Sequence, residues 1–124
     1  MTYVLTSYGE IIDKYTILEI KLENIKNVAK REHILKDLEA LESTVNALQE
    51  KGILNLTHEL KTVNQALWLI EDRIRVKEQL TEFDEEFISL ARSVYLKNDE
   101  RSQIKYKINI LTSSPLVEEK SYQS

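Results

Sequence analysis

Charged residues that lie in or beside apolar helical stripes are the residues of this chain best placed to do chemistry. Glu71 falls about 40° from the centre of such a stripe when residues are placed at 100° per step, and Arg75 follows one turn later. Glu19 borders another stripe. A lone buried carboxylate is costly, so each of these positions needs a cation or a donor nearby. The pattern predicts a salt-bridge network that fixes helix register, and its alternative is a polar pocket that holds a small ligand.

The candidate polar pocket is expected between the first, third and fourth helices. Its residues are Glu10, Asp13, Glu19, Glu71, Arg75 and Arg92. Acids in a first helical turn also favour the helix dipole, and Glu10 stands four residues before a lysine, as in a helical ion pair. A structural role is therefore the simpler interpretation of Glu10 and Asp13.

A second candidate site is a basic cluster near the end of the chain. Lysine and arginine recur from residue 97 to residue 107. Asn98 reads as the cap of a last helix, where free backbone N–H groups favour anions. The candidate anion site therefore consists of Asn98, Arg101 and Lys105. Its alternative is a solvated helix face, because Asp99 and Glu100 dilute the positive charge.

Metal chemistry has one weak sequence signal. Glu10 with Asp13, and Glu39 with Glu42, are spaced like the paired acids of all-helical nucleotide pyrophosphohydrolases, which use magnesium. The Glu-x-x-Asp element comes first here, against the order expected for that class. The chain has no Glu-x-x-His, no His-Glu-x-x-His and no Gly-x-Ser-x-Gly motif. We predict no metal site and no cofactor, with magnesium only under the hydrolase alternative.

Helical periodicity from residue 8 to about residue 112 must position these side chains. Apolar residues recur at alternating steps of three and four in five segments, which is typical of bundle or coiled-coil packing. The first predicted helix starts at a capping box of Ser7 with Glu10, the second at Asn27 and the third at Asn55 or Thr57. The fourth follows a short break at 81–84, and the fifth starts at Asn98. We expect one all-α domain over residues 1–124. It is an antiparallel helical bundle of three long and two shorter helices, with a C-terminal tail from about residue 113.

Two predicted helices carry apolar residues outside their main stripes. These residues are Ile17, Ile20, Leu69, Val76 and Leu80. We expect at least two of the first four to lie in a contact between chains or under the C-terminal tail. We also expect Trp68 to be mostly buried against another helix, because an exposed indole leaves a large apolar area in water.

Composition excludes several classes of protein. The chain has 124 residues, a formal net charge of −4, no cysteine, two glycines and one proline. A disulfide scaffold, a thiol nucleophile and thiolate metal ligands are therefore excluded. The acidic balance argues against nucleic acid as a partner, and no apolar run is long enough to span a membrane. We expect a cytoplasmic protein.

Four strings of the sequence resemble a small bacterial family of all-helical proteins known only as a domain of unknown function. They are GEIIDKYTILEIKLENI, LWLIEDRIRVKE, FISLARSVYLKNDERSQIKYKIN and LVEEKSY. The resemblance extends from Gly9 to Tyr122 and implies that the chain is a complete member of that family, tail included. It implies no activity, ligand or catalytic residue. A lysine- and isoleucine-rich composition indicates a bacterial or phage source.

We predict a structural or protein-interaction module that acts as a homo-oligomer, with an unidentified protein as a further partner class. The alternative is a small-molecule-binding protein or hydrolytic enzyme of the metal-dependent pyrophosphohydrolase type. The sequence favours the module, because no catalytic constellation is present and two helices carry a second apolar face.

Overall fold

The computed structural model describes residues 1–120, which form four helices and no strand. The helices are α1 (Tyr8–Asn24), α2 (Val28–Gln49), α3 (Leu54–Gln79) and α4 (Glu85–Leu111). The predicted all-α class is confirmed. The predicted five helices are four, because the last two predicted helices form one.

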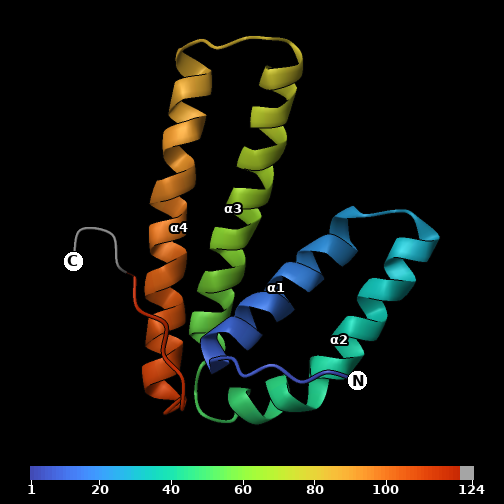
Figure 1. The fold of residues 1–124 in the computed structure, drawn as a ribbon, viewed down its shortest axis with the longest axis vertical. Helices are drawn as coiled ribbons and strands as arrows, with labels where there is room; N and C mark the ends of the chain where they lie inside the picture. The colour runs from blue at the N-terminus through green and yellow to red at the C-terminus, as the bar shows by residue number, and fades with distance from the viewer. Residues whose placement is uncertain (121–124) are drawn as a thin grey trace.

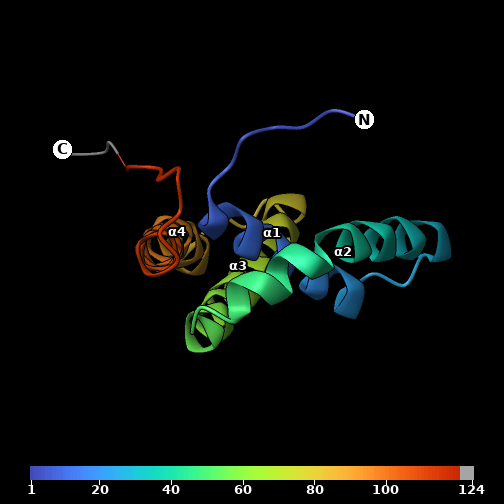
Figure 2. The ribbon, with the colours of Figure 1, turned by 90° about the horizontal axis from the view of Figure 1, so that it is seen from below.

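The helices are arranged as two antiparallel hairpins. Figure 1 shows the α1–α2 hairpin inclined across one end of the longer α3–α4 hairpin, so that the other end of the longer hairpin projects beyond it. Viewed along the long hairpin, α1 lies on one face of the α3–α4 pair and α2 lies outside α1 (Figure 2). The distal half of the α3–α4 hairpin is therefore covered by neither α1 nor α2.

Side-chain caps begin three of the helices. Ser7 accepts a hydrogen bond from the Glu10 backbone N–H at 3.2 Å, and Asn27 accepts one from Lys30 at 3.0 Å. Both caps were predicted from the sequence, and Asp84 caps α4 in the same way. The predicted cap at Asn55 or Thr57 is wrong. α3 begins at Leu54 after Ile53, which makes no side-chain cap bond.

α4 runs without interruption through Asn98, so the helix start predicted there is wrong. The apolar stripe of Phe87, Leu90 and Val94 continues to Ile104 and Ile108 at helical spacing, but its two intermediate positions, 97 and 101, are charged. The predicted break rested on Asn98, which is followed by two acids as at a helix start. No glycine or proline lies between residues 85 and 111. Asparagine favours helix caps, but packing against α3 keeps the helix continuous through Asn98.

The apolar core lies where all four helices meet. It consists of Ile12, Val45, Leu48, Ile53, Leu60, Val63, Leu67, Ile104 and Ile108. Each such side chain contributes roughly 1.5–3 kcal/mol when it is fully buried. Burial is therefore concentrated at one end of the α3–α4 hairpin, and the distal end must be held by other contacts.

Gly9 allows α1 to begin in direct contact with α4. A Cβ atom at residue 9 would lie 2.6 Å from the backbone oxygen of Lys105 and 2.9 Å from Oδ1 of Asn109. In its place, the Gly9 N–H donates to Asn109 Oδ1 at 2.7 Å. Asn109 is itself buried. This close approach sets the distance between α1 and α4, and with it the geometry of the polar contacts described next.

The apolar residues outside the main stripes separate into two groups. Ile20 is buried and Ile17 is partly buried within the chain itself, whereas Leu69 and Val76 remain exposed. The described part of the tail lies beside α4 (Figure 1). Coverage of Leu69 and Val76 by a second copy stays a prediction.

Candidate functional site

The most deeply buried charge of the described chain is the carboxylate of Asp13, in the second turn of α1. Its residue is 2% exposed. Arg101 of α4 donates to it through both Nε, at 2.9 Å from Oδ1, and Nη2, at 2.5 Å from Oδ2. This hydrogen-bonded contact raises the pKa of Arg101, so the guanidinium remains charged. The pair joins α1 to α4 through two residues that lie 88 positions apart in the sequence.

Asn64 of α3 completes the partners of Asp13. Its Nδ2 atom donates to Asp13 Oδ1 and to Thr16 Oγ1, both at 2.9 Å. Thr16 in turn donates to the Asp13 backbone oxygen at 2.8 Å. The buried carboxylate is thus satisfied by donors from α3 and α4, as a buried charge requires. This arrangement fixes the relative position of three helices.

The two candidate sites predicted from the sequence are partly bound to each other. Glu10, from the candidate polar pocket, pairs with Lys105 of the candidate anion site at 2.6 Å. Asp13 and Arg101 form the second such pair. Because α4 does not begin at Asn98, that residue offers no helix N-terminus to an anion. The part of the anion-site prediction that rested on a helix start is therefore wrong, whereas anion binding by the basic residues stays a prediction.

The remaining residues of the predicted polar pocket lie in different places. Glu19 is 3.9 Å from Lys61, which pairs more closely with Glu23 at 2.6 Å. Arg92 is exposed on α4. Glu71 and Arg75 both line a cleft between α1, α3 and α4.

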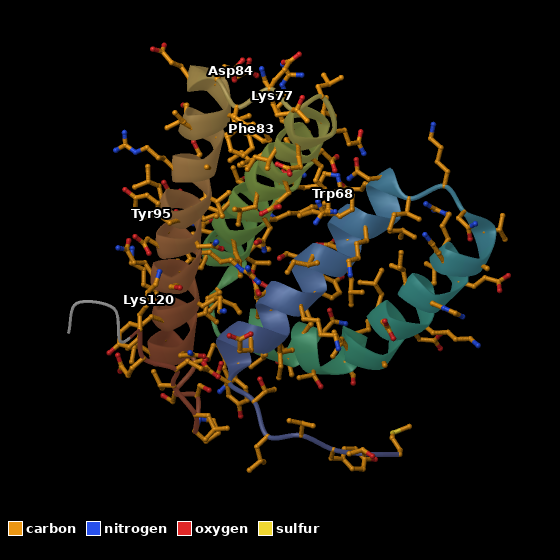
Figure 3. All side chains as sticks on the ribbon, turned by 45° about the horizontal axis from the view of Figure 1, so that its top comes forward. Trp68, Lys77, Phe83, Asp84, Tyr95 and Lys120 are labelled. Atoms are coloured by element: carbon orange, nitrogen blue, oxygen red, sulfur yellow. The ribbon has the colours of Figure 1, made fainter. Side chains whose placement is uncertain are left out.

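We call this cleft the Trp68 cleft. It has a volume of about 280 Å³ and is lined by Ile17, Ile20, Asn64, Leu67, Trp68, Glu71, Asp72, Arg75 and Arg101. It lies where α1 diverges from the α3–α4 hairpin, and Figure 3 shows Trp68 at that junction. Most of the surface of Trp68 is covered, as predicted, although the residue is not fully buried.

Charged groups surround the apolar floor of the Trp68 cleft. The side chains of Glu71, Asp72 and Arg75 make no hydrogen bond or ion pair with another described residue. The expected ion pair between Glu71 and Arg75 is therefore not formed. Arg101 reaches the cleft from α4 while it holds Asp13. The cleft thus combines an apolar surface with unpaired charges of both signs.

A second charge cluster, which sequence reasoning missed, closes the distal end of the α3–α4 hairpin. Lys77 is only 4% exposed and contacts Asp84 at 2.8 Å, Glu82 at 3.1 Å and Glu86 at 3.3 Å. Hydrogen bonds to Asp84 and Glu82 raise the pKa of Lys77. Figure 3 shows Lys77 and Asp84 together beside the turn. The signal in the sequence was a group of four acids among residues 82–86, shortly after a helix with Lys77 in its last turn.

The acidic pairs that suggested a magnesium enzyme do not converge. Asp13 is bound by Arg101 and Asn64, while Glu39 and Glu42 are exposed on α2. Among residues 1–120, no group of three or more histidine or acidic side chains is arranged to hold a metal ion.

A wider groove runs along the outer side of α4 beside the C-terminal tail. Its volume is about 1130 Å³, and its lining includes the candidate anion-site residues Asn98, Arg101 and Lys105. The acids Asp99, Glu118 and Glu119 line it as well, and Lys120 contacts Asp99. Figure 3 shows Tyr95 and Lys120 on this side of α4. Its mixed charges do not favour an anion.

Comparison with known proteins identifies the chain by family alone. None of the helices over the described range is long and apolar enough to cross a membrane. No curated protein and no solved structure matches the chain. The model of one family matches residues 2–124 and so includes all four helices and the tail. The chain belongs to this family, DUF6165, a family of unknown function.

Proposed function

We propose that this protein is a helical interaction module that assembles with a second copy of itself through the α3–α4 hairpin. One observation carries the proposal. Leu69 and Val76 of α3, Leu80 directly after α3 and Leu96 of α4 are all exposed on the hairpin, with Leu69 at 68% and Leu80 at 58%. We call these four residues the apolar seam. Exposed apolar residues that recur at helical spacing on one face are typical of interaction surfaces.

The apolar seam faces away from α1. Along α3 the seam continues the face of Thr62 by steps of seven, seven and four residues. It lies about 100° around the helix from Trp68 and about 160° from Glu71. On α4, Leu96 shares the face of Gln103. Thr62 and Gln103 both line a groove of about 460 Å³ between α3 and α4. The seam and this groove therefore form one continuous face along the hairpin.

The size of this face suits a dimer. α3 has 26 residues, which corresponds to a length of about 39 Å, and two adjacent helices are about 20 Å wide. The resulting area, about 800 Å², is what a stable interface of standard size buries on each partner. Two hairpins packed antiparallel along this face make a four-helix bundle, a common packing of amphipathic helices.

Charge on this face also suits a second copy. The chain as a whole has a formal net charge of −4, which disfavours self-association. The charges beside the seam, however, have both signs, since Arg73 pairs with Glu86 at 2.8 Å and the groove contains Glu100 with Lys107. A two-fold interface brings the same patch against itself, so mixed charges allow complementary contacts. The absence of cysteine is compatible with assembly in a reducing cytoplasm.

The test is the mass of the protein in solution. Sedimentation or light scattering of the full chain is expected to show a dimer, and Leu69→Glu with Leu80→Glu is expected to give a monomer that keeps its helical circular dichroism. Both residues are exposed within the chain, so these changes leave the monomer core intact.

The matched control is Leu35→Glu on α2, which changes a leucine that is 50% exposed away from the seam. This variant should remain dimeric. A wild-type monomer at concentrations well above the micromolar range would refute the proposal. A dimer that survives both seam substitutions would refute the assignment of this face.

A further inference from the structure

The Trp68 cleft has the features of a small-molecule site, and it lies on a different face of α3 from the apolar seam. Its floor is formed by Ile17, Ile20, Leu67 and Trp68. Ligand sites typically combine such an apolar lining with a few polar groups that fix orientation. Binding in this cleft does not require the proposed dimer.

The polar groups of the cleft are free to bind a ligand. Glu71, Asp72 and Arg75 have no side-chain partner among the described residues. Elsewhere on the hairpin, acids and bases that lie close together do pair, as Arg73 does with Glu86. The charges around the cleft therefore differ from those of the network at the end of the hairpin, because nothing in the described chain neutralises them.

Two further groups in the cleft are preorganised by the buried network. Arg101 uses Nε and Nη2 to hold Asp13, which leaves Nη1 without a bond to a described residue. Asn64 uses Nδ2 for Asp13 and Thr16, so its amide oxygen is the group left to accept a bond. Both side chains line the cleft in fixed orientations. Fixed polar groups lose little entropy when a ligand binds.

We propose that the Trp68 cleft binds a free α-amino acid with a large apolar side chain. In this arrangement the ligand carboxylate pairs with Arg75, whose planar guanidinium suits a carboxylate. The ligand ammonium pairs with Glu71 and Asp72. The apolar side chain lies on Trp68 and Ile17.

The balance of charges favours a zwitterion over a simple ion. An anion without an amine would meet the unpaired acids Glu71 and Asp72, and a cation without a carboxylate would meet Arg75. The positive charge of Arg101 is already compensated by Asp13 behind it. A cavity of about 280 Å³ is near the lower end of the range for small-molecule sites, which fits a ligand the size of one amino acid.

The chain contains its own reporter for this test, because Trp68 is its only tryptophan. Titration of the full chain with L-phenylalanine is expected to change the tryptophan fluorescence saturably, with a Kd below about 1 mM. Phenethylamine, which lacks the carboxylate, and 3-phenylpropanoate, which lacks the ammonium, are expected to bind at least about tenfold more weakly. Loss of one charged hydrogen bond is worth about that factor or more.

Two substitutions separate the roles of the charges. Arg75→Gln should weaken the binding of L-phenylalanine at least about tenfold and leave the binding of phenethylamine unchanged. Glu71→Gln should weaken the binding of L-phenylalanine and leave the binding of 3-phenylpropanoate unchanged. Neither side chain bonds to another described residue, so both variants should keep the melting temperature of the wild type. The matched controls are Arg92→Gln and Glu32→Gln, both exposed outside the cleft, and these should bind as the wild type does.

Three results would overturn the proposal. The first is the absence of a saturable change with L-phenylalanine. The second is equal binding of all three compounds, which would show that the charges do not select a zwitterion. The third is equal weakening by the cleft and control substitutions, which would show that the fluorescence reports general surface charge.

Discussion

Asp13 and Arg101 lie 88 positions apart, yet two nitrogens of the Arg101 guanidinium hold the two carboxylate oxygens of Asp13. The carboxylate is almost completely buried, while the Arg101 side chain keeps 28% of its surface exposed. This asymmetry matters because an arginine that loses its partner can turn to water, whereas a carboxylate on the core side cannot.

Arg101→Met is expected to destabilise the protein by about 3–5 kcal/mol, because it leaves the Asp13 charge buried with Asn64 as its remaining side-chain donor. Asp13→Asn should cost less, and the double variant should recover much of the loss from Arg101→Met. Urea unfolding measures all three. Lys105→Met, which breaks the more exposed Glu10–Lys105 pair, should cost no more than about 1 kcal/mol. If the losses of stability from Asp13→Asn and Arg101→Met simply add in the double variant, the Asp13–Arg101 contact does not contribute to stability.

Gly9→Ala is expected to destabilise the protein by about 1–3 kcal/mol, although alanine favours helix over glycine. The reason is the new Cβ atom, which would lie 2.6 Å from the backbone oxygen of Lys105 and cannot be relieved by a side-chain rotation. Thermal and urea unfolding provide the measurement. Lys14→Ala, at an exposed position of the same helix, should be nearly neutral. A Gly9→Ala variant as stable as the wild type would contradict the close approach of α1 to α4.

Thr81→Gly is expected to stabilise the protein by about 0.5–1 kcal/mol. Thr81 has φ 52° at the end of α3, where the Glu82 N–H donates to the Lys77 carbonyl at 2.9 Å. This left-handed position normally carries glycine, because a Cβ atom is strained there. Ser113, with φ 53° after α4, offers a second test by Ser113→Gly. If Thr81→Gly lowers the melting temperature, the left-handed conformation of this residue is not the native one.

The Lys77 cluster predicts a specific loss of stability in acid. Lys77 lowers the pKa of Asp84, and Arg73 together with Lys77 lowers the pKa of Glu86, in each case through hydrogen bonds to the charged carboxylate. Each acid therefore stabilises the fold fully above its unfolded pKa, near 4, and this contribution disappears as the pH falls through the lower pKa of the folded state.

Lys77→Met should weaken this part of the pH dependence. The urea midpoint of the wild type should fall between about pH 5 and pH 3, and that of the variant should fall less steeply, because Asp84 then has no cation to lower its pKa. Lys51→Met, which removes an exposed lysine, should keep the wild-type slope. Equal slopes for wild type and Lys77→Met would mean that the cluster does not lower these pKa values in solution.

The sequence by itself determined the helical class, most of the helix ends and two of the caps. These features depend on local spacing, since the capping oxygens of Ser7 and Asn27 act on N–H groups only three residues away. Spacing also placed Glu71 and Arg75 on one face of α3, because residues four apart share a helical face.

Only the tertiary structure decided which charges are buried and what they contact. Arg101 and Lys105 read as a basic cluster because the acids that hold them, Asp13 and Glu10, lie about 90 positions away in the sequence. The continuity of α4 is a second example, since Asn98 followed by two acids has the local pattern of a helix start, and packing against α3 keeps the helix unbroken there. Spacing along one helix specifies a face, but the contacts of that face depend on how the two hairpins cross.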